Sequence, residues 1–369
     1  MEFGLFCLNA QRDISKRPRE IFLETLDQVR AVEDVGFDVA WFAEHHFSNY
    51  CLCPSPMTMT TYMAGQTKRI KLGPAVIVAP LYEKIRLLED IGVADQLSDG
   101  RLVLGFGTGY QAYEFHKFGV DLKTARDQLI ETLDLVELYF SGEPVSFDGK
   151  YVKLPPTSFS VTPLQKKPAV YIAGMASDVE MQRRAVERNY VPFFTTGWNS
   201  HDTNRQTRVK VEAAYSAAGG DTSTMPFALQ RYAFVTTSKK QAQKAADGAR
   251  YIRRIASAMR ENRGVLDGAF LKELPAPDEP SLDEIESRLL IGDAERVAEK
   301  LATESASLGV SHVSCFMAIP GLEQSEVLRS IEEFGRSVIP AVNKHEAWKT
   351  SKPISPEPAG HISGAPKVG

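Results

Sequence analysis

The feature that most constrains the fold is a regular alternation of strand-like and helix-like segments along almost the whole chain. Short runs rich in β-branched and aromatic residues predict strands at 3–7, 39–42, 70–78, 102–106, 170–173, 191–195, 232–236 and 312–317. Amphipathic stretches predict helices at 20–35, 87–97, 125–139, 177–188, 203–217, 239–254, 293–308 and 324–337. Eight parallel strands joined by helices favour an α/β fold of the closed (β/α)₈ TIM barrel type over an open doubly wound sheet.

Three segments do not fit this simple repeat. Residues 143–167 contain Asp148-Gly149 between β-prone residues, which predicts a hairpin inserted before the fifth barrel strand. Residues 260–290, after the seventh strand, are polar and contain three prolines, as expected of a long lid-like loop. Residues 346–369 are rich in Pro, Gly and Ser. We therefore expect one barrel domain over residues 1–345 and a disordered tail over 346–369.

Composition narrows the possible functions. The chain is 43% hydrophobic and 24% charged, and its net charge of −4 lacks the basic footprint of a nucleic-acid-binding protein. No apolar run approaches the ~18 residues of a membrane span, and no signal-peptide pattern opens the chain. The four cysteines are scattered, which suits a reducing cytoplasm. We predict a cytoplasmic protein with neither nucleic-acid nor membrane partners.

The second predicted strand ends abruptly in Glu44-His45-His46. In a parallel barrel such a strand end faces the active-site mouth. Adjacent strand residues point to opposite faces, so His45 and His46 make an awkward metal site, and no other ligand cluster completes one. This count argues against a metal-dependent barrel hydrolase. One histidine at the mouth, oriented by a neighbouring carboxylate, suits proton transfer near neutral pH, and the alternative is a satisfied structural histidine.

Two glycine-containing strand ends allow a structural and a functional interpretation. Gly105 to Tyr110 (GFGTGY) fails the dinucleotide pattern G-x-G-x-x-G, and the next predicted helix starts only near Lys123. Either the backbone approaches a flat ligand there, or the turn needs positive φ. After the fifth strand, Ser177 and Glu180 match a capping box. The competing interpretation is that Gly174 and the amides near Ser177 cradle a phosphate.

Taken in order, several motifs resemble the bacterial luciferase-like, flavin-dependent monooxygenase family. They are AEHHF at 43–47, AVIVAP at 75–80, DQLSDGR at 95–101, GFGTGY at 105–110 with Glu114, VYIAG at 170–174 and IGDAERV at 291–297. The resemblance covers roughly the first 340 residues. It implies a (β/α)₈ barrel that holds FMN at the carboxyl ends of its strands. It also implies that the reduced flavin (FMNH₂) comes from a separate NAD(P)H:flavin reductase and reacts with O₂, and that the flavin hydroperoxide oxygenates a small organic substrate. Homodimers are usual in the family.

The resemblance also assigns individual residues. His45 matches the active-site histidine and Glu44 its neighbouring carboxylate. The cofactor-binding positions are Ala75 and Val76 under the flavin ring, often with unusual peptide geometry, then Gly107, Thr108, Gly109 and Tyr110 beside it, and Gly174, Met175, Ala176, Ser177 and Val179 at the phosphate.

Two positions depart from the family pattern. The luciferase subunit has a reactive cysteine where this chain has Gly107, and a phosphate-binding arginine where it has Thr108. The first departure argues against a light emitter. The second leaves the phosphate charge to backbone amides and another basic side chain.

The sequence thus predicts an FMN-dependent monooxygenase with His45 as general acid or base. Its dry pocket would be walled by Phe6, Phe42, Phe106 and Trp198. Two rivals share the barrel: a deazaflavin-dependent oxidoreductase that transfers hydride without oxygen, and a non-catalytic flavin-binding protein. Fold alone does not choose among the three.

Overall fold

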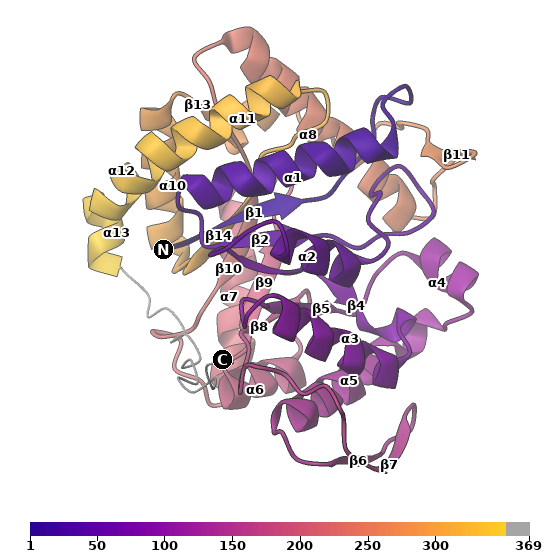
Figure 1. Cartoon of the computed structure of the whole chain (residues 1–369). Coiled ribbons are helices and arrows are strands. Elements are labelled where there is room, and N and C mark those ends of the chain that lie inside the picture. The colour runs from indigo at the N-terminus through magenta and orange to yellow at the C-terminus, as the bar shows by residue number, and fades with distance from the viewer. Residues whose placement is uncertain (352–369) are drawn as a thin grey trace, which may run out of the picture.

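The computed structural model describes residues 1–351, and the predicted tail from residue 352 onward lies outside the described residues. Its centre is a ring of parallel strands surrounded by helices (Figure 1). The neighbouring strands run in the order β3-β2-β1-β14-β10-β9-β8-β5-β4. Their bounds are β1 (Glu2–Cys7), β2 (Val39–Phe42), β3 (Lys71–Pro74), β4 (Ile77–Val78), β5 (Leu104–Gly107), β8 (Val170–Ala173), β9 (Val191–Thr195), β10 (Ala228–Val235) and β14 (His312–Phe316).

Backbone hydrogen bonds around Leu72 join the two ends of this order. The Leu72 N–H donates to the Arg101 carbonyl at 3.1 Å, and the Val103 N–H donates to the Leu72 carbonyl at 3.0 Å. β3 and β4 are two pieces of the third predicted strand, separated by Ala75 and Val76. The predicted (β/α)₈ barrel is therefore confirmed.

All eight predicted helices are present with shifted ends. They are α1 (Pro18–Asp34), α3 (Lys84–Leu97), α5 (Ala125–Phe140), α6 (Val179–Arg188), α7 (His201–Ala217), α8 (Lys239–Arg260), α10 (Ala294–Leu308) and α11 (Gln324–Glu333). The chain also forms short helices that were not predicted, because segments of this length carry little periodic signal. These are α2 (Pro56–Ala64), α4 (Ala112–Phe118), α9 (Leu282–Arg288), α12 (Ile339–Lys344) and α13 (Glu346–Ser351). Among residues 1–351, no helix has the length and apolar character needed to cross a bilayer.

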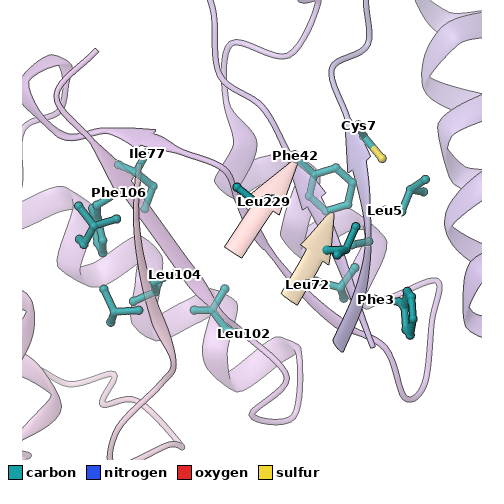
Figure 2. Close-up of a cluster of buried hydrophobic side chains, with 14 of the residues drawn as sticks. Phe3, Leu5, Cys7, Phe42, Leu72, Ile77, Leu102, Leu104, Phe106 and Leu229 are labelled. Atoms are coloured by element: carbon teal, nitrogen blue, oxygen red, sulfur yellow. The ribbon is translucent and has the colours of Figure 1, made fainter. Parts of the chain in front are cut away.

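Alternate side chains along the barrel strands enter two different cores. Leu5, Phe42 and Phe106 pack outward with the inner faces of the helices, and Figure 2 shows them in this cluster. Phe6 and Trp198 belong to a second cluster that fills the barrel. The predicted pocket walls are therefore wrong for Phe42 and Phe106, because strand alternation turns them away from the interior.

The sequence predicted the insertion at 143–167 better than the one at 260–290. The predicted hairpin is present as antiparallel β6 (Val145–Asp148) and β7 (Lys153–Thr157). The segment 260–290 is more ordered than a loop. It contains the pair β11 (Leu266–Asp267) and β12 (Phe270–Leu271), then α9, and leads into β13 (Leu290–Gly292), which pairs with β10. The predicted tail also starts too early, because α13 is helical and buries Trp348 to 3% exposure.

Candidate active site at the barrel mouth

His45 follows β2 at the carboxyl ends of the strands, where barrel active sites form. Its Nδ1 lies 3.1 Å from Glu114 Oε1 and 3.1 Å from Gln111 Nε2. The side chain is 13% exposed, and Nε2 has no hydrogen-bond partner in the described part of the chain. A carboxylate can only accept, so Glu114 favours the tautomer with the proton on Nδ1, in which Gln111 Nε2, itself a donor, makes no hydrogen bond to that atom. Nε2 is then left as a free basic nitrogen at the mouth.

Glu114 is the carboxylate that sequence reasoning did not assign to His45. It lies on α4, which begins at Ala112 rather than near Lys123 as predicted. Its carboxyl group is 1% exposed and also accepts the His46 backbone N–H at 2.7 Å. The sequence carried only one hint, the presence of Glu114 beside a matching family motif.

Glu44 does not orient His45, so that expectation is wrong. Its Oε1 lies 3.0 Å from His46 Nε2, and its Oε2 accepts the Val78 N–H at 3.0 Å and the Tyr82 hydroxyl at 2.9 Å. Burial raises the pKa of Glu44, while these hydrogen bonds act in the opposite direction. The Glu44–His46 pair thus ties the end of β2 to β4, which is a structural role.

Two tyrosines line the mouth beside His45. The Tyr50 ring centroid is 4.7 Å from that of His45, and the Tyr110 centroid is 5.6 Å away. Tyr50 and Tyr110 share a side-chain hydrogen bond, and burial raises the pKa of both phenols. Both hydroxyls therefore stay protonated at neutral pH. Gln111 Oε1 is buried beside them with no hydrogen-bond partner in residues 1–351, so a ligand donor could satisfy it.

The predicted ring-binding residues form a strip of nearly bare backbone between β4 and β5. The Ala75–Val76 peptide bond is cis, the kind of unusual geometry that the resemblance implied. A Cβ added at Gly107 would lie 2.8 Å from Val76 Cγ2, so the chain has little room for a larger side chain there. Gly109 has φ +71°, and Thr108 Oγ1 donates to its carbonyl at 3.1 Å. The positive-φ interpretation therefore applies at Gly109, and the approach of the backbone to a flat ligand stays a prediction.

The predicted phosphate-binding turn follows β8. Gly174 (φ +80°) and Met175 (φ +57°) are both left-handed, and a Cβ at Gly174 would meet open space. Gly174 comes directly after β8. It lies beside the strip at the end of β5, because Ile172 of β8 pairs with Phe106 of β5. Ala176 is half-buried, and Ser177 and Val179 are exposed.

The predicted capping box at Ser177 is wrong. Asp178 caps α6 instead, and its carboxylate accepts the Met181 N–H at 2.9 Å. Glu180 pairs with Arg183 and Arg184 rather than reaching back to the cap. Arg126 of α5 also donates to Asp178 at 2.6 Å, which holds a guanidinium beside the turn. The Asp178 carboxylate would repel an anion bound at the turn, and its pairing with Arg126 reduces that repulsion.

The described residues provide no set of side chains that could bind a metal ion. Within residues 1–351, no group of three or more His, Cys, Asp or Glu side chains is placed to hold a metal ion.

Comparison with known proteins places this geometry in context. The family described as luciferase-like monooxygenase matches residues 1–312. The uncharacterized protein y4vJ of Sinorhizobium fredii is 35% identical over 346 residues, which cover 93% of this chain and 98% of that protein. The oxygenase component of the flavin-dependent trigonelline monooxygenase of Acinetobacter baylyi is 23% identical over 96% of this chain and 99% of its own.

Two solved structures share the fold but carry different cofactors. The oxygenating constituent of 3,6-diketocamphane monooxygenase from Pseudomonas putida, in complex with FMN, aligns with a TM-score of 0.75 at 22% identity, covering 92% of this chain and 98% of that one. An F420-dependent secondary alcohol dehydrogenase aligns with a TM-score of 0.69 at 20% identity and the same coverage. At these identities the likeness shows the fold alone.

Proposed function

This chain belongs to the luciferase-like monooxygenase family, and we propose that it is an FMN-dependent monooxygenase that inserts one oxygen atom from O₂ into a small organic substrate. The observation that carries the proposal is His45, whose Nδ1 is held by Glu114 and whose Nε2 is free at the mouth. A mere binding protein has no need of a free basic nitrogen held in this way. We assign His45 as the general acid or base, and Glu114 as the residue that positions it.

The residues at the mouth fit FMN. The strip at Ala75, Val76 and Gly107 offers a surface with little side chain for a flat ring. The unpartnered Gln111 Oε1 beside Tyr110 can accept a hydrogen bond from a ring N–H. The left-handed turn at Gly174 and Met175, with Arg126 behind it, suits a phosphate, because backbone amides and a guanidinium supply positive potential.

Reduced FMN, when bound, supplies the activation of O₂ that oxygen transfer requires. The protein's own contribution is to bind, to exclude water and to move a proton. Phe6, Tyr232 and Phe316 fill the interior below the mouth and keep it dry. His45 Nε2 takes up or returns a proton as the oxygen is transferred. The Glu44 carboxylate, which bonds to His46, Val78 and Tyr82 rather than to the His45 ring, positions β4.

The setting of the reaction is part of the same proposal. A separate NAD(P)H:flavin reductase delivers the reduced cofactor, as the name "oxygenase component" of the trigonelline relative suggests. The chain acts as a homodimer in the cytoplasm. The F420-dependent neighbour keeps a deazaflavin hydride transfer as the rival reaction.

The test needs no known substrate. The protein is mixed with FMN reduced under nitrogen and is then exposed to air, and the return of oxidised-flavin absorbance is followed. We expect this return to be delayed relative to free FMN, and labelled O₂ to appear in the product once a substrate turns over. Reoxidation as fast as that of free FMN, together with tighter binding of a deazaflavin than of FMN, would favour the rival.

A further inference from the structure

Helix α8 presents two kinds of arginine. It carries four in all, and two of them are neutralised by carboxylates. Arg250 pairs with Asp247 at 2.5 Å, and Arg254 pairs with Glu273 at 2.8 Å and with Glu279 at 2.5 Å. These pairs account for the charge on one side of the helix.

Arg253 and Arg260 form no ion pair with any carboxylate among residues 1–351. The Arg253 Cζ lies 5.9 Å from the Trp198 ring centroid, and the Arg260 Cζ lies 4.7 Å from that of Tyr110. Burial raises the pKa of Tyr232, and the Arg253 charge opposes that rise. An aromatic face attracts a cation but carries no net charge, so both guanidiniums remain free to bind an anion.

Arg260 lies against a ring of the mouth, and Arg253 lies against Trp198, which follows the carboxyl end of β9. The Tyr110 ring that Arg260 covers at 4.7 Å is itself 5.6 Å from the His45 ring, so the Arg260 Cζ is at most 10.3 Å from His45. Trp198 and Tyr232 belong to the aromatic cluster inside the barrel. A small planar molecule at the mouth would extend over the Tyr110 ring, with one end near His45 and a charged end toward the arginines.

We propose that the substrate is a small organic carboxylate, and that Arg253 and Arg260 bind its anionic group and so determine specificity. This inference rests on the proposed function, since it names the class of substrate for that site. Carboxylate is the anion that best fits two planar guanidiniums, because each can donate two parallel hydrogen bonds to it. The predicted phosphate-binding turn lies beside Arg126, which belongs to α5 rather than to α8.

The test is a binding measurement that needs no turnover. Benzoate, phenylacetate and hexanoate are titrated calorimetrically into the protein loaded with oxidised FMN, and each is compared with its neutral methyl ester. At least one acid should bind about tenfold or more tightly than its ester, and the double variant Arg253→Gln/Arg260→Gln should lose that preference by about 10- to 100-fold.

Arg263→Gln is the matched control. Arg263 follows the same helix but pairs with Glu261 at the surface, so its variant should bind the acids as the wild type does. Equal affinity for acids and esters would overturn the proposal, and so would an acid preference that the double variant retains. Inorganic phosphate that displaces the acids in an arginine-dependent way would assign the pair to the cofactor instead.

The outcomes separate this inference from the reaction. If oxygen transfer fails but the acids bind in an arginine-dependent way, the proposed reaction is wrong and the anion site stands. If oxygen transfer succeeds on neutral substrates and the double variant behaves as the wild type, only the anion site is wrong.

Discussion

A histidine lies near each end of the barrel, and the two side chains are used in opposite ways. At the amino ends of the strands, Trp41 Nε1 donates to His312 Nε2 at 3.2 Å. Tryptophan can only donate, so the neutral His312 ring carries its proton on Nδ1, which lies 3.2 Å from the Tyr171 hydroxyl. Tyr171 in turn donates to Glu2 at 3.2 Å. In this floor cluster (Trp41, His312, Tyr171 and Glu2), both ring nitrogens are committed.

At the mouth, His45 commits only Nδ1. Its side chain is 13% exposed, against 1% for His312. The residue types are nearly the same at both ends: each has a histidine, a carboxylate and at least one tyrosine. The difference is one nitrogen, His45 Nε2, which has no hydrogen-bond partner in the described residues. It can therefore exchange a proton with a ligand. The number of ring nitrogens that have hydrogen-bond partners, rather than the residue type, therefore distinguishes a structural histidine from a catalytic candidate.

The largest effect is expected from a substitution of His45 at the mouth. His45→Ala should slow substrate oxygenation about 10²- to 10⁴-fold, because the general acid–base group is lost. The free energy of unfolding in urea should change by only about 1 kcal/mol, because the ring gives up few buried contacts. Unchanged turnover in this variant would remove His45 from the mechanism.

The matching change at the floor should have the opposite outcome. His312→Ala leaves a cavity and unpaired groups on Trp41 and Tyr171, so it should cost about 2–4 kcal/mol of unfolding free energy. Oxygenation per folded molecule should stay within about twofold, because the site at the mouth is distant and independent. A variant that loses rate but keeps its stability would break the comparison.

The floor should also respond to acid. Burial alone would raise the pKa of Glu2, but the hydrogen bonds from His312 and Tyr171 and the nearby Lys71 lower it from 4.5 to about 2. A lowered carboxylate pKa contributes stability that is present above the unfolded value and is lost as pH falls toward the folded value. Urea titrations between about pH 5 and pH 2 should show a loss of roughly 2–3 kcal/mol that Glu2→Gln removes. An equally steep loss in Glu2→Gln would assign it to other groups.

The smallest effect is expected from a substitution of Glu114, which tests whether this residue positions His45. Glu114→Gln keeps an acceptor for the His46 N–H but removes the charge beside His45 Nδ1, so the rate should fall about tenfold. Ring ¹⁵N shifts of His45 should show the proton redistributed between Nδ1 and Nε2. If both the rate and the shifts match the wild type, Glu114 has no positioning role.

Local pattern was sufficient for the barrel. The strand and helix periodicities are read over a few residues each, and all eight predicted helices and the eight-strand ring were present. The short helix α4 escaped because seven residues carry too little periodicity. The strand faces of Phe42 and Phe106 were misjudged because a short apolar run does not show which of its two faces turns inward. The strand at 39–42 was bounded correctly, yet Phe42 packs outward.

The sequence by itself determined that a histidine and a carboxylate stand at the end of the second strand, that glycines line the neighbouring strand ends, and that the family pattern surrounds them. Only the tertiary structure decided which groups meet. Glu114 lies 69 residues from His45 along the chain, and Arg126 lies 52 residues from Asp178. Closure of the barrel brings them together, because partner choice depends on strand order and register, which no local pattern encodes.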